Sequence, residues 1–217
     1  NHDMTLTELK TLIQNYTEND ETTFVNTLND MIINTEERIA ELIEFDYFRK
    51  NVTGSLTTGN TYLTAPTDFK LSFSLAVIDS NNDYHYLDKK HTSFMREYSN
   101  DAVDTSERGR PLYYADFDKD LSTASNNGST LIVSPVPDQT YTVELHYLYK
   151  PTSLTSQTTG TWMSNNARNA LLYGSLIEAS TFMKGEPEMQ VVYETRFGQE
   201  IQRLKNMAEA RGRRDKY

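Results

Sequence analysis

Cysteine is absent from the 217 residues, so the chain can form neither a disulfide nor a thiolate metal site. This absence is compatible with a reducing compartment and also with an extracellular protein that folds without disulfides, so the redox environment stays open. The sequence also lacks an apolar run approaching the ~20 residues that span a bilayer, and it lacks a charged-then-apolar leader. We therefore expect a soluble chain without a targeting segment.

Apolar residues are scarce for a compact monomer, since they make up 37% of the sequence and the mean hydropathy is −0.65. The 14 tyrosines and 9 phenylalanines partly compensate, because each carries a large ring that can be buried. A mass of 25.0 kDa is enough for one domain or for two small ones. We expect a chain this polar to gain part of its order from neighbouring subunits.

Positive charge is in deficit overall, which gives a formal net charge of −10, but it gathers at the C-terminal end. Residues 203–217 contain six basic and two acidic residues, a balance of +4, which leaves −14 for residues 1–202. An acidic body does not attract the phosphates of DNA, so a sequence-specific DNA-binding protein is disfavoured. The basic end can still dock onto an acidic partner.

Catalytic motifs are missing as well. Neither the nucleophilic serine motif G-x-S-x-G nor the phosphate-binding motif G-x-x-x-x-G-K-[ST] occurs. Asp116 and Asp118 flank Phe117, but without a second group of catalytic residues these carboxylates are expected in an exposed loop. The sequence therefore predicts no enzymatic activity and no catalytic residue.

Metal-ligating residues do not occur at the spacing that a site needs. Asp79, Asn81 and Asp83 begin like a calcium-binding loop, but Tyr84 occupies the glycine position and Lys90 the position of the bidentate carboxylate. We interpret this segment as a polar hairpin turn. The histidines show neither the H-x-x-x-H nor the H-x-x-E-H spacing; they are His2, His85, His91 and His146. No metal and no cofactor is predicted.

The N-terminal part of the chain has the period of amphipathic helices. Thr5 and Glu8 form a capping box before a short first helix. A second helix is predicted from Phe24 to about Phe45, because apolar residues recur there at helical spacing. The side of this helix that is expected to face solvent carries four glutamates, which are Glu36, Glu37, Glu41 and Glu44.

The C-terminal third returns to this helical period. Ser164 or Asn165 is expected to cap a helix that Gly185 ends. Pro187 is well placed in the first turn of a last, long amphipathic helix. From Arg211 onward we expect an extended, polar tail.

The middle of the chain has the pattern of short antiparallel strands separated by turns rich in Gly, Asn and Pro. The segments 71–78 and 84–87 are predicted to form a hairpin around Asn81, and 92–98 a helical interruption. Residues 152–161, rich in Ser and Thr, are interpreted as a linker.

The predicted fold class is therefore α+β, with two parts. Residues 1–46 and 162–210 form a helical bundle built from both chain ends, since their apolar faces need a partner. Residues 47–161 form an inserted antiparallel β-sandwich or barrel-like domain. Residues 211–217 form an extended basic C-terminal tail.

Tyrosines are frequent in the predicted strands and permit two interpretations. They can form a stacking platform for sugars or single strands, or they can cover a half-buried sheet or a subunit interface. The second interpretation is favoured, and the acidic body makes the stacking of nucleic acid poorer still. Trp162 lies at the junction of the β region and the next helix, where packing is expected. The tyrosines concerned are Tyr84, Tyr86, Tyr113, Tyr114, Tyr141, Tyr147 and Tyr149.

Several segments together resemble the head-to-tail adaptor proteins of short-tailed bacteriophages, also called tail tubular protein A or gatekeeper-type adaptors. The similarity covers nearly the whole chain, and its motifs are structural. They are Arg49-Lys50-Asn51 at the start of the β insertion, Pro111-Leu112-Tyr113-Tyr114, Pro135-Val136-Pro137-Asp138, Tyr141-Thr142-Val143-Glu144-Leu145, Leu171-Leu172-Tyr173-Gly174-Ser175-Leu176 and Phe182-Met183-Lys184-Gly185-Glu186-Pro187-Glu188.

This resemblance implies a structural virion protein that forms a homo-oligomeric ring, dodecameric in that family. The ring lies beneath the portal protein in the tail or neck of the virion, with the tail nozzle protein, and sometimes tail fibres, attached below. Genomic DNA is ejected through its channel without sequence-specific binding, and assembly takes place in the host cytoplasm. We expect carboxylates or neutral polar groups along such a channel, because a basic wall would bind DNA.

Two further hypotheses concern parts of the chain. The basic end, with Arg211, Arg213, Arg214, Lys216 and Tyr217, is predicted to dock on acidic groups of the portal; a disordered, solvated end is the alternative. The competing function for the whole chain is a carbohydrate-binding or tail-fibre-attachment β module of a phage tail. The third hypothesis for the function of the chain is a glycoside hydrolase.

Overall fold

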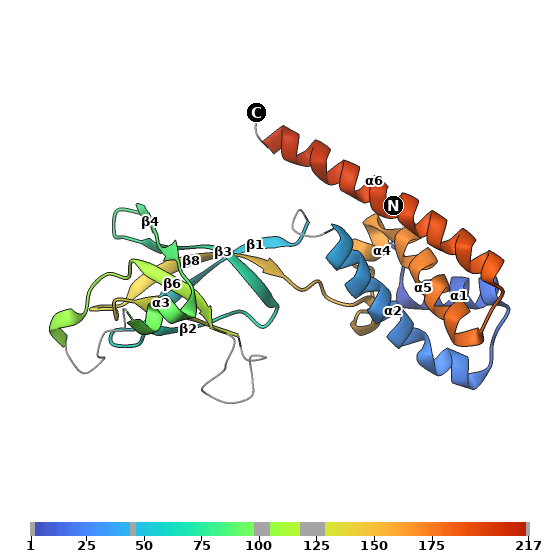
Figure 1. Cartoon of the computed structure of the whole chain (residues 1–217), viewed down its shortest axis with the longest axis horizontal. Helices are drawn as coiled ribbons and strands as arrows, with labels where there is room; N and C mark the ends of the chain where they lie inside the picture. The colour runs from blue at the N-terminus through green and yellow to red at the C-terminus, as the bar shows by residue number, and fades with distance from the viewer. Residues whose placement is uncertain (1–2, 44–46, 98–104, 118–128, 216–217) are drawn as a thin grey trace. The chain divides into compact units, whose positions relative to one another are not determined.

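The protein has an α+β structure that separates into two compact units. The computed structural model describes residues 3–43, 47–97, 105–117 and 129–215. One unit combines both ends of the chain, Asn1–Tyr47 and Pro151–Tyr217, and the other is the intervening segment Phe48–Lys150. Figure 1 shows helices in the first unit and mainly strands in the second.

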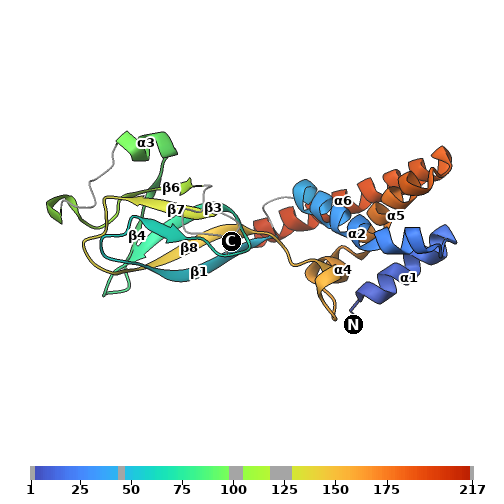
Figure 2. The same cartoon turned by 90° about the horizontal axis from the view of Figure 1, so that it is seen from below.

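Helix α5 (Arg168–Met183) is the centre of the helical unit. It contacts α1 (Leu6–Thr17), α2 (Thr22–Ile43), α4 (Trp162–Asn166) and α6 (Pro187–Asp215), as Figure 2 shows from below. Its buried residues point to all sides, which is typical of a helix enclosed by others. The surrounding helices are amphipathic: α6, for example, buries Tyr193, Phe197, Ile201, Leu204 and Ala208.

The predicted starts of the first and last helices are confirmed. The Thr5 hydroxyl accepts a hydrogen bond from the Glu8 amide at 3.3 Å, and Pro187 begins α6. The predicted cap at Ser164 or Asn165 is wrong, because the helix before Gly185 is α5, which begins at Arg168 after Ala167 and has no side-chain cap. Thr161 caps α4, and Ser164 is the third residue of its capping box, because each side chain bonds the other's amide.

Two segments expected to be irregular are ordered. Helix α6 continues to Asp215, so the expected extended conformation from Arg211 is wrong for residues 211–215; the three arginines in this segment favour helix, although Gly212 does not. The expected linker contains the 3₁₀ turn η3 (Leu154–Ser156), in which Leu154 is 0% exposed. This segment belongs to the helical unit.

Glu36 on α2 explains how the segment at η3 is held. Its carboxylate accepts hydrogen bonds from the Ser153 hydroxyl at 2.6 Å and from the Leu154 amide at 2.9 Å. Its expected place on the wet side of the helix is therefore wrong, since it is only 7% exposed. A buried carboxylate requires such donors, and the backbone supplies one of them.

The β unit consists of two four-stranded sheets. The first has the order β1 (Arg49–Leu56), β8 (Tyr141–Tyr149), β3 (Phe69–Ile78) and β4 (Tyr84–Tyr86), all antiparallel. The predicted hairpin is confirmed, with Ile78 opposite Tyr84. Strands β1 and β8, by which the chain enters and leaves this unit, pair along their length, from Arg49 with Leu148 to Leu56 with Tyr141.

The second sheet has the order β2 (Tyr62–Thr64), β7 (Thr130–Ser134), β6 (Tyr113–Phe117) and β5 (Asp88–Lys89). Strands β5 and β6 pair in parallel, which corrects the expectation of a purely antiparallel domain. The long connection between them, which includes α3 (Thr92–Glu97) and η2 (Thr105–Glu107), permits a parallel pair.

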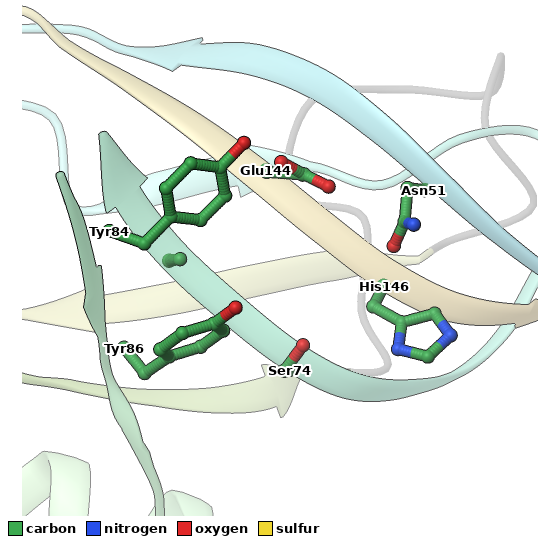
Figure 3. A pocket seen from close by; sticks show the side chains of 7 residues that line it. Asn51, Ser74, Tyr84, Tyr86, Glu144 and His146 are labelled. Atoms are coloured by element: carbon green, nitrogen blue, oxygen red, sulfur yellow. The ribbon is translucent and has the colours of Figure 1, made fainter. Parts of the chain in front are cut away.

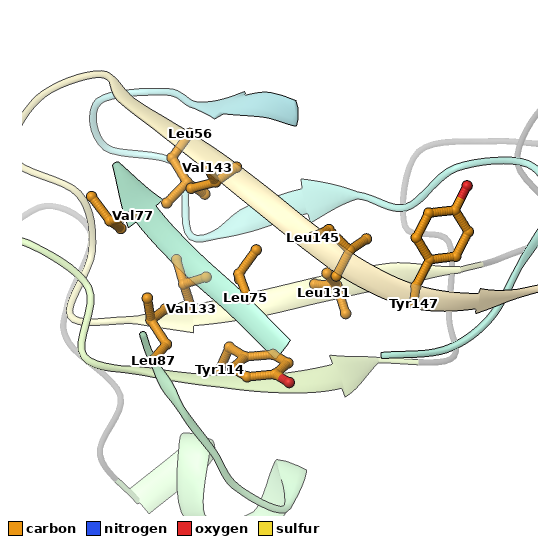
Figure 4. Close-up of a cluster of buried hydrophobic side chains, with 10 residues drawn as sticks. All are labelled: Leu56, Leu75, Val77, Leu87, Tyr114, Leu131, Val133, Val143, Leu145 and Tyr147. Atoms are coloured by element: carbon orange, nitrogen blue, oxygen red, sulfur yellow. The ribbon is translucent and has the colours of Figure 1, made fainter. Parts of the chain in front are cut away.

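A single buried cluster joins the two sheets, so the unit is a β-sandwich. Figure 4 shows its side chains, contributed by β1, β3, β6, β7 and β8 and by the residue after β4. Tyr114 and Tyr147 belong to this core, whereas Tyr84 and Tyr86 are exposed. The cluster consists of Leu56, Leu75, Val77, Leu87, Tyr114, Leu131, Val133, Val143, Leu145 and Tyr147.

Candidate functional site

The outer face of the first sheet carries a shallow hollow that we call the sheet hollow. Alternation along the strands sends Val143 and Leu145 into the core and Glu144 and His146 to this outer face. Register places Ser74 opposite His146, and Ala76 between Glu144 and Tyr86. The lining residues come from four strands; they are Asn51, Ser74, Ala76, Tyr84, Tyr86, Glu144 and His146.

Figure 3 shows how these side chains lie around the hollow, which has a volume of about 180 Å³. Tyr84 and Tyr86 lean from β4 across β3, with ring centroids 6.3 Å apart. Ser74 and Ala76 form a low floor because their side chains are small. Glu144 and His146 stand on the side opposite the two rings.

The charge in the sheet hollow is set by Glu144. The Tyr84 hydroxyl hydrogen-bonds this carboxylate, which raises the pKa of the tyrosine. Burial, and then the positive charge of Arg49, lower the pKa of His146. At neutral pH the hollow therefore contains a carboxylate, a neutral imidazole, an amide and hydroxyl groups.

A second surface is the C-terminal end of α6. Figure 1 shows that this end continues past the other helices of its unit. Ala208 is the last residue of α6 that is buried among the described side chains, and Arg211 is exposed. Of the predicted docking residues, Arg213 and Arg214 also lie in α6, whereas Lys216 and Tyr217 fall outside the described residues.

The carboxylates considered for catalysis or calcium have other partners. The expected exposed loop is wrong for Asp116, which lies in strand β6. Its carboxylate accepts a hydrogen bond from the Ser72 hydroxyl at 2.6 Å and lies 3.2 Å from the Lys89 ammonium. Asp118 falls outside the described residues. Asp79 accepts bonds from the amides of Asn81 and Asp83 and lies 2.8 Å from the His85 ring, as the predicted polar turn requires.

The described residues contain neither a group of metal ligands nor a helix that could cross a membrane. In the ranges 3–43, 47–97, 105–117 and 129–215, no three His, Asp or Glu side chains come together as metal ligands. Within the same ranges no helix combines the length and the apolar character needed to cross a membrane.

Trp162 was expected to pack at the junction of the β region and the next helix. The centroid of its ring lies 4.6 Å from the centroid of the Tyr47 ring.

Tyr84 and Tyr86 were among the tyrosines considered for a sugar-stacking platform, but neither the sheet hollow nor the role of Glu36 was predicted from the sequence. The alternation in 141–149 and the paired tyrosines of 84–86 indicated which residues share a face, but the pairing of Asn51 with His146 depends on strand order. That order cannot be read from local pattern.

Comparison with known proteins gives one family match. The family model described as SU10 adaptor protein matches residues 4–216, nearly the whole chain and both units. A search of curated proteins gives no match. This match confirms the resemblance to phage adaptor proteins that was based on segments of both units. The family consists of structural virion proteins. The chain belongs to the SU10 adaptor protein family of phages.

Proposed function

We propose that this chain assembles into a ring between the portal and the tail nozzle of a virion and forms part of the channel through which DNA is ejected. The observation that supports this most is the family match over residues 4–216, which includes the sandwich and the helical unit. The ring is expected to be dodecameric, as the resemblance to short-tailed phage adaptors implies. The polar composition supports assembly, because burial between subunits supplements modest cores.

The C-terminal end of α6 is the part we assign to portal docking. The helix continues beyond its last buried contact, Ala208, into a segment with three arginines, Arg211, Arg213 and Arg214. Helical propensity alone gives a chain end little stability in water, so a partner surface that contacts this end would stabilise it. Arginine forms paired hydrogen bonds with carboxylates, which makes an acidic portal surface the matching partner.

The acidic character of the remaining chain supports passage of DNA. Residues 1–202 carry a balance of −14, and Glu37 and Glu41 are exposed on α2. Carboxylates repel phosphates, so DNA would slide along such a wall without binding. The expected result is that the assembled ring does not retain duplex DNA at about 0.15 M salt. Retention at that salt concentration would contradict an acidic lumen.

The docking role is tested with purified portal protein. Replacing the three arginines by glutamine should weaken binding at least about tenfold, a loss of roughly 1.4 kcal/mol. Arg168→Gln is the matched control, because Arg168 is an exposed arginine on α5. Sedimentation with and without portal reports binding and the mass of the ring together. Undiminished binding of the triple variant would remove the docking role, and a monomeric chain in the presence of portal would contradict the ring.

A further inference from the structure

The sheet hollow has the two ingredients of a polar ligand site, exposed aromatic rings and unengaged hydrogen-bonding groups. Tyr84 and Tyr86 are 47% and 66% exposed. Tyrosine offers a rigid apolar face together with a polar tip, so an exposed adjacent pair provides a surface on which a flat ligand can stack. Figure 3 shows both rings beside the same opening.

The polar side chains of the hollow still have hydrogen-bonding capacity. Among the residues that the structure describes, the side chains of Asn51, Ser74 and His146 make no hydrogen bond to protein. Asn51 and His146 each offer a donor and an acceptor, Ser74 offers both on one oxygen, and Glu144 accepts only. A ligand that matches this set needs several donors and several acceptors within about 180 Å³.

This combination discriminates among ligand classes. A lysine or arginine side chain would satisfy Glu144 and the tyrosine faces, but it has no acceptor for the Asn51 amide. An acidic sugar or a phosphate would be repelled by Glu144. A neutral sugar has apolar ring faces for the tyrosines and hydroxyl groups that both donate and accept.

We propose that the sheet hollow binds a single neutral pyranose ring of a glycan. The sugar stacks on Tyr86, donates adjacent hydroxyls to the two oxygens of Glu144, and is further held by Asn51 and His146. The small residues Ser74 and Ala76 leave room for the ring. This binding activity goes beyond the adaptor role and does not depend on it.

Saturation-transfer NMR on the full chain tests the proposal, with the methyl glycosides of glucose, galactose and N-acetylglucosamine as probes and glucuronate as the acidic comparison. At least one neutral probe should bind with a dissociation constant on the order of 1 to 10 mM, as expected for so small a ligand. Glucuronate should give no transfer.

Variants connect the signal to the hollow. Tyr86→Ala should weaken binding roughly threefold to tenfold. Glu144→Gln should weaken the neutral sugar and reduce discrimination against glucuronate. Tyr62→Ala is the control, because Tyr62 is an exposed tyrosine on the other sheet, and it should bind as the parent chain does. If Tyr86→Ala fails to fold, Asn51→Ala replaces it with the same expectation.

Three outcomes would overturn the proposal. One is no transfer from any neutral probe at about 10 mM. Another is an equal loss of binding in Tyr62→Ala. The third is that Tyr86→Ala abolishes ring formation while no sugar binds, which would identify the hollow as a contact between protein chains. The portal and ring measurements are separate, so a failure here leaves the adaptor role intact.

Discussion

The helical unit buries a carboxylate, whereas the buried polar side chains described in the β unit are the hydroxyls of Ser72 and Ser134. The helical unit encloses the Glu36 carboxylate and uses it to fasten η3 onto α2. The β unit fills its interior with apolar and aromatic side chains and displays polar groups on one outer face. In the helical unit a buried carboxylate orders a segment distant in the sequence, whereas apolar packing between two sheets holds the β unit together.

The largest expected effect tests whether the two units have separate cores. Leu75→Ala in the sandwich and Leu171→Ala in α5 each remove a fully buried side chain, so each should cost about 2–5 kcal/mol of unfolding free energy. Near-ultraviolet circular dichroism and hydrogen exchange should locate each loss in its own unit. Equal loss of protection in both units from either variant would show one cooperative core instead.

Removing the buried Glu36 carboxylate should lower the stability of the helical unit by the second-largest amount. Glu36→Ala leaves the Leu154 amide without its acceptor, so we expect a loss of about 1.5–3 kcal/mol and faster exchange of that amide. Glu41→Ala, on the exposed surface of the same helix, is the control and should change stability by less than about 0.5 kcal/mol. Similar values for the two variants would mean that Glu36 does not fasten the segment.

A substitution at Gly174, where α5 closely approaches α2 and α6, should have an intermediate effect on stability. A Cβ on Gly174 would overlap the Thr35 methyl group and lie 2.9 Å from the Phe197 ring. Gly174→Ala should therefore destabilise the helical unit by about 1–3 kcal/mol, in spite of alanine's better helix propensity. Gly198→Ala is the control, because a Cβ there meets nothing within 4 Å, and it should be neutral or stabilising. Chemical denaturation measures both.

In the β unit, loss of the Tyr147 hydroxyl should have the smallest effect on stability at neutral pH. Its hydroxyl donates to Asp68 at 2.8 Å, and burial, followed by this bond, raises the pKa of Tyr147 to about 12. Tyr147→Phe should cost about 1 kcal/mol at pH 7.

The pH dependence follows from the raised pKa of Tyr147. The folded state holds the phenolic proton more tightly than the unfolded state, so this stabilisation is complete below pH 10 and is lost as the pH rises through about 12. Denaturation of the parent and of Tyr147→Phe between these pH values should show a smaller decline for the variant. An equal decline would place the alkaline sensitivity elsewhere.

Local signals in the sequence predicted much of the fold. Thr5 with Glu8, Pro187 and the turn at Asn81 each fix backbone geometry within a few residues, and the structure has the predicted element at each. Errors arose where tertiary contacts decide. Glu36 looks like a surface residue because its donors, Ser153 and Leu154, lie far away in the sequence.

The sheet hollow was beyond prediction for a related reason. Its two tyrosines and Glu144 could be placed on strand faces by alternation, but they meet only because the sheet has the order β1, β8, β3, β4. That order places residue 51 beside residue 146 across a long stretch of chain. The parallel pairing of β5 with β6 was likewise set by a crossover, and not by the pattern of either strand.

Strands β1 and β8, the first and last strands of the sandwich, pair with each other, so both ends of the β unit lie at the same edge of a sheet. Arg49 lies opposite Leu148, and the Tyr149 amide donates to the Phe48 carbonyl at 2.9 Å, so the polypeptide departs and returns at adjacent points. A turn of a few residues could close the gap that removal of the whole β unit would leave. Residues 48–150 could therefore be removed as one segment with the order of the helices unchanged.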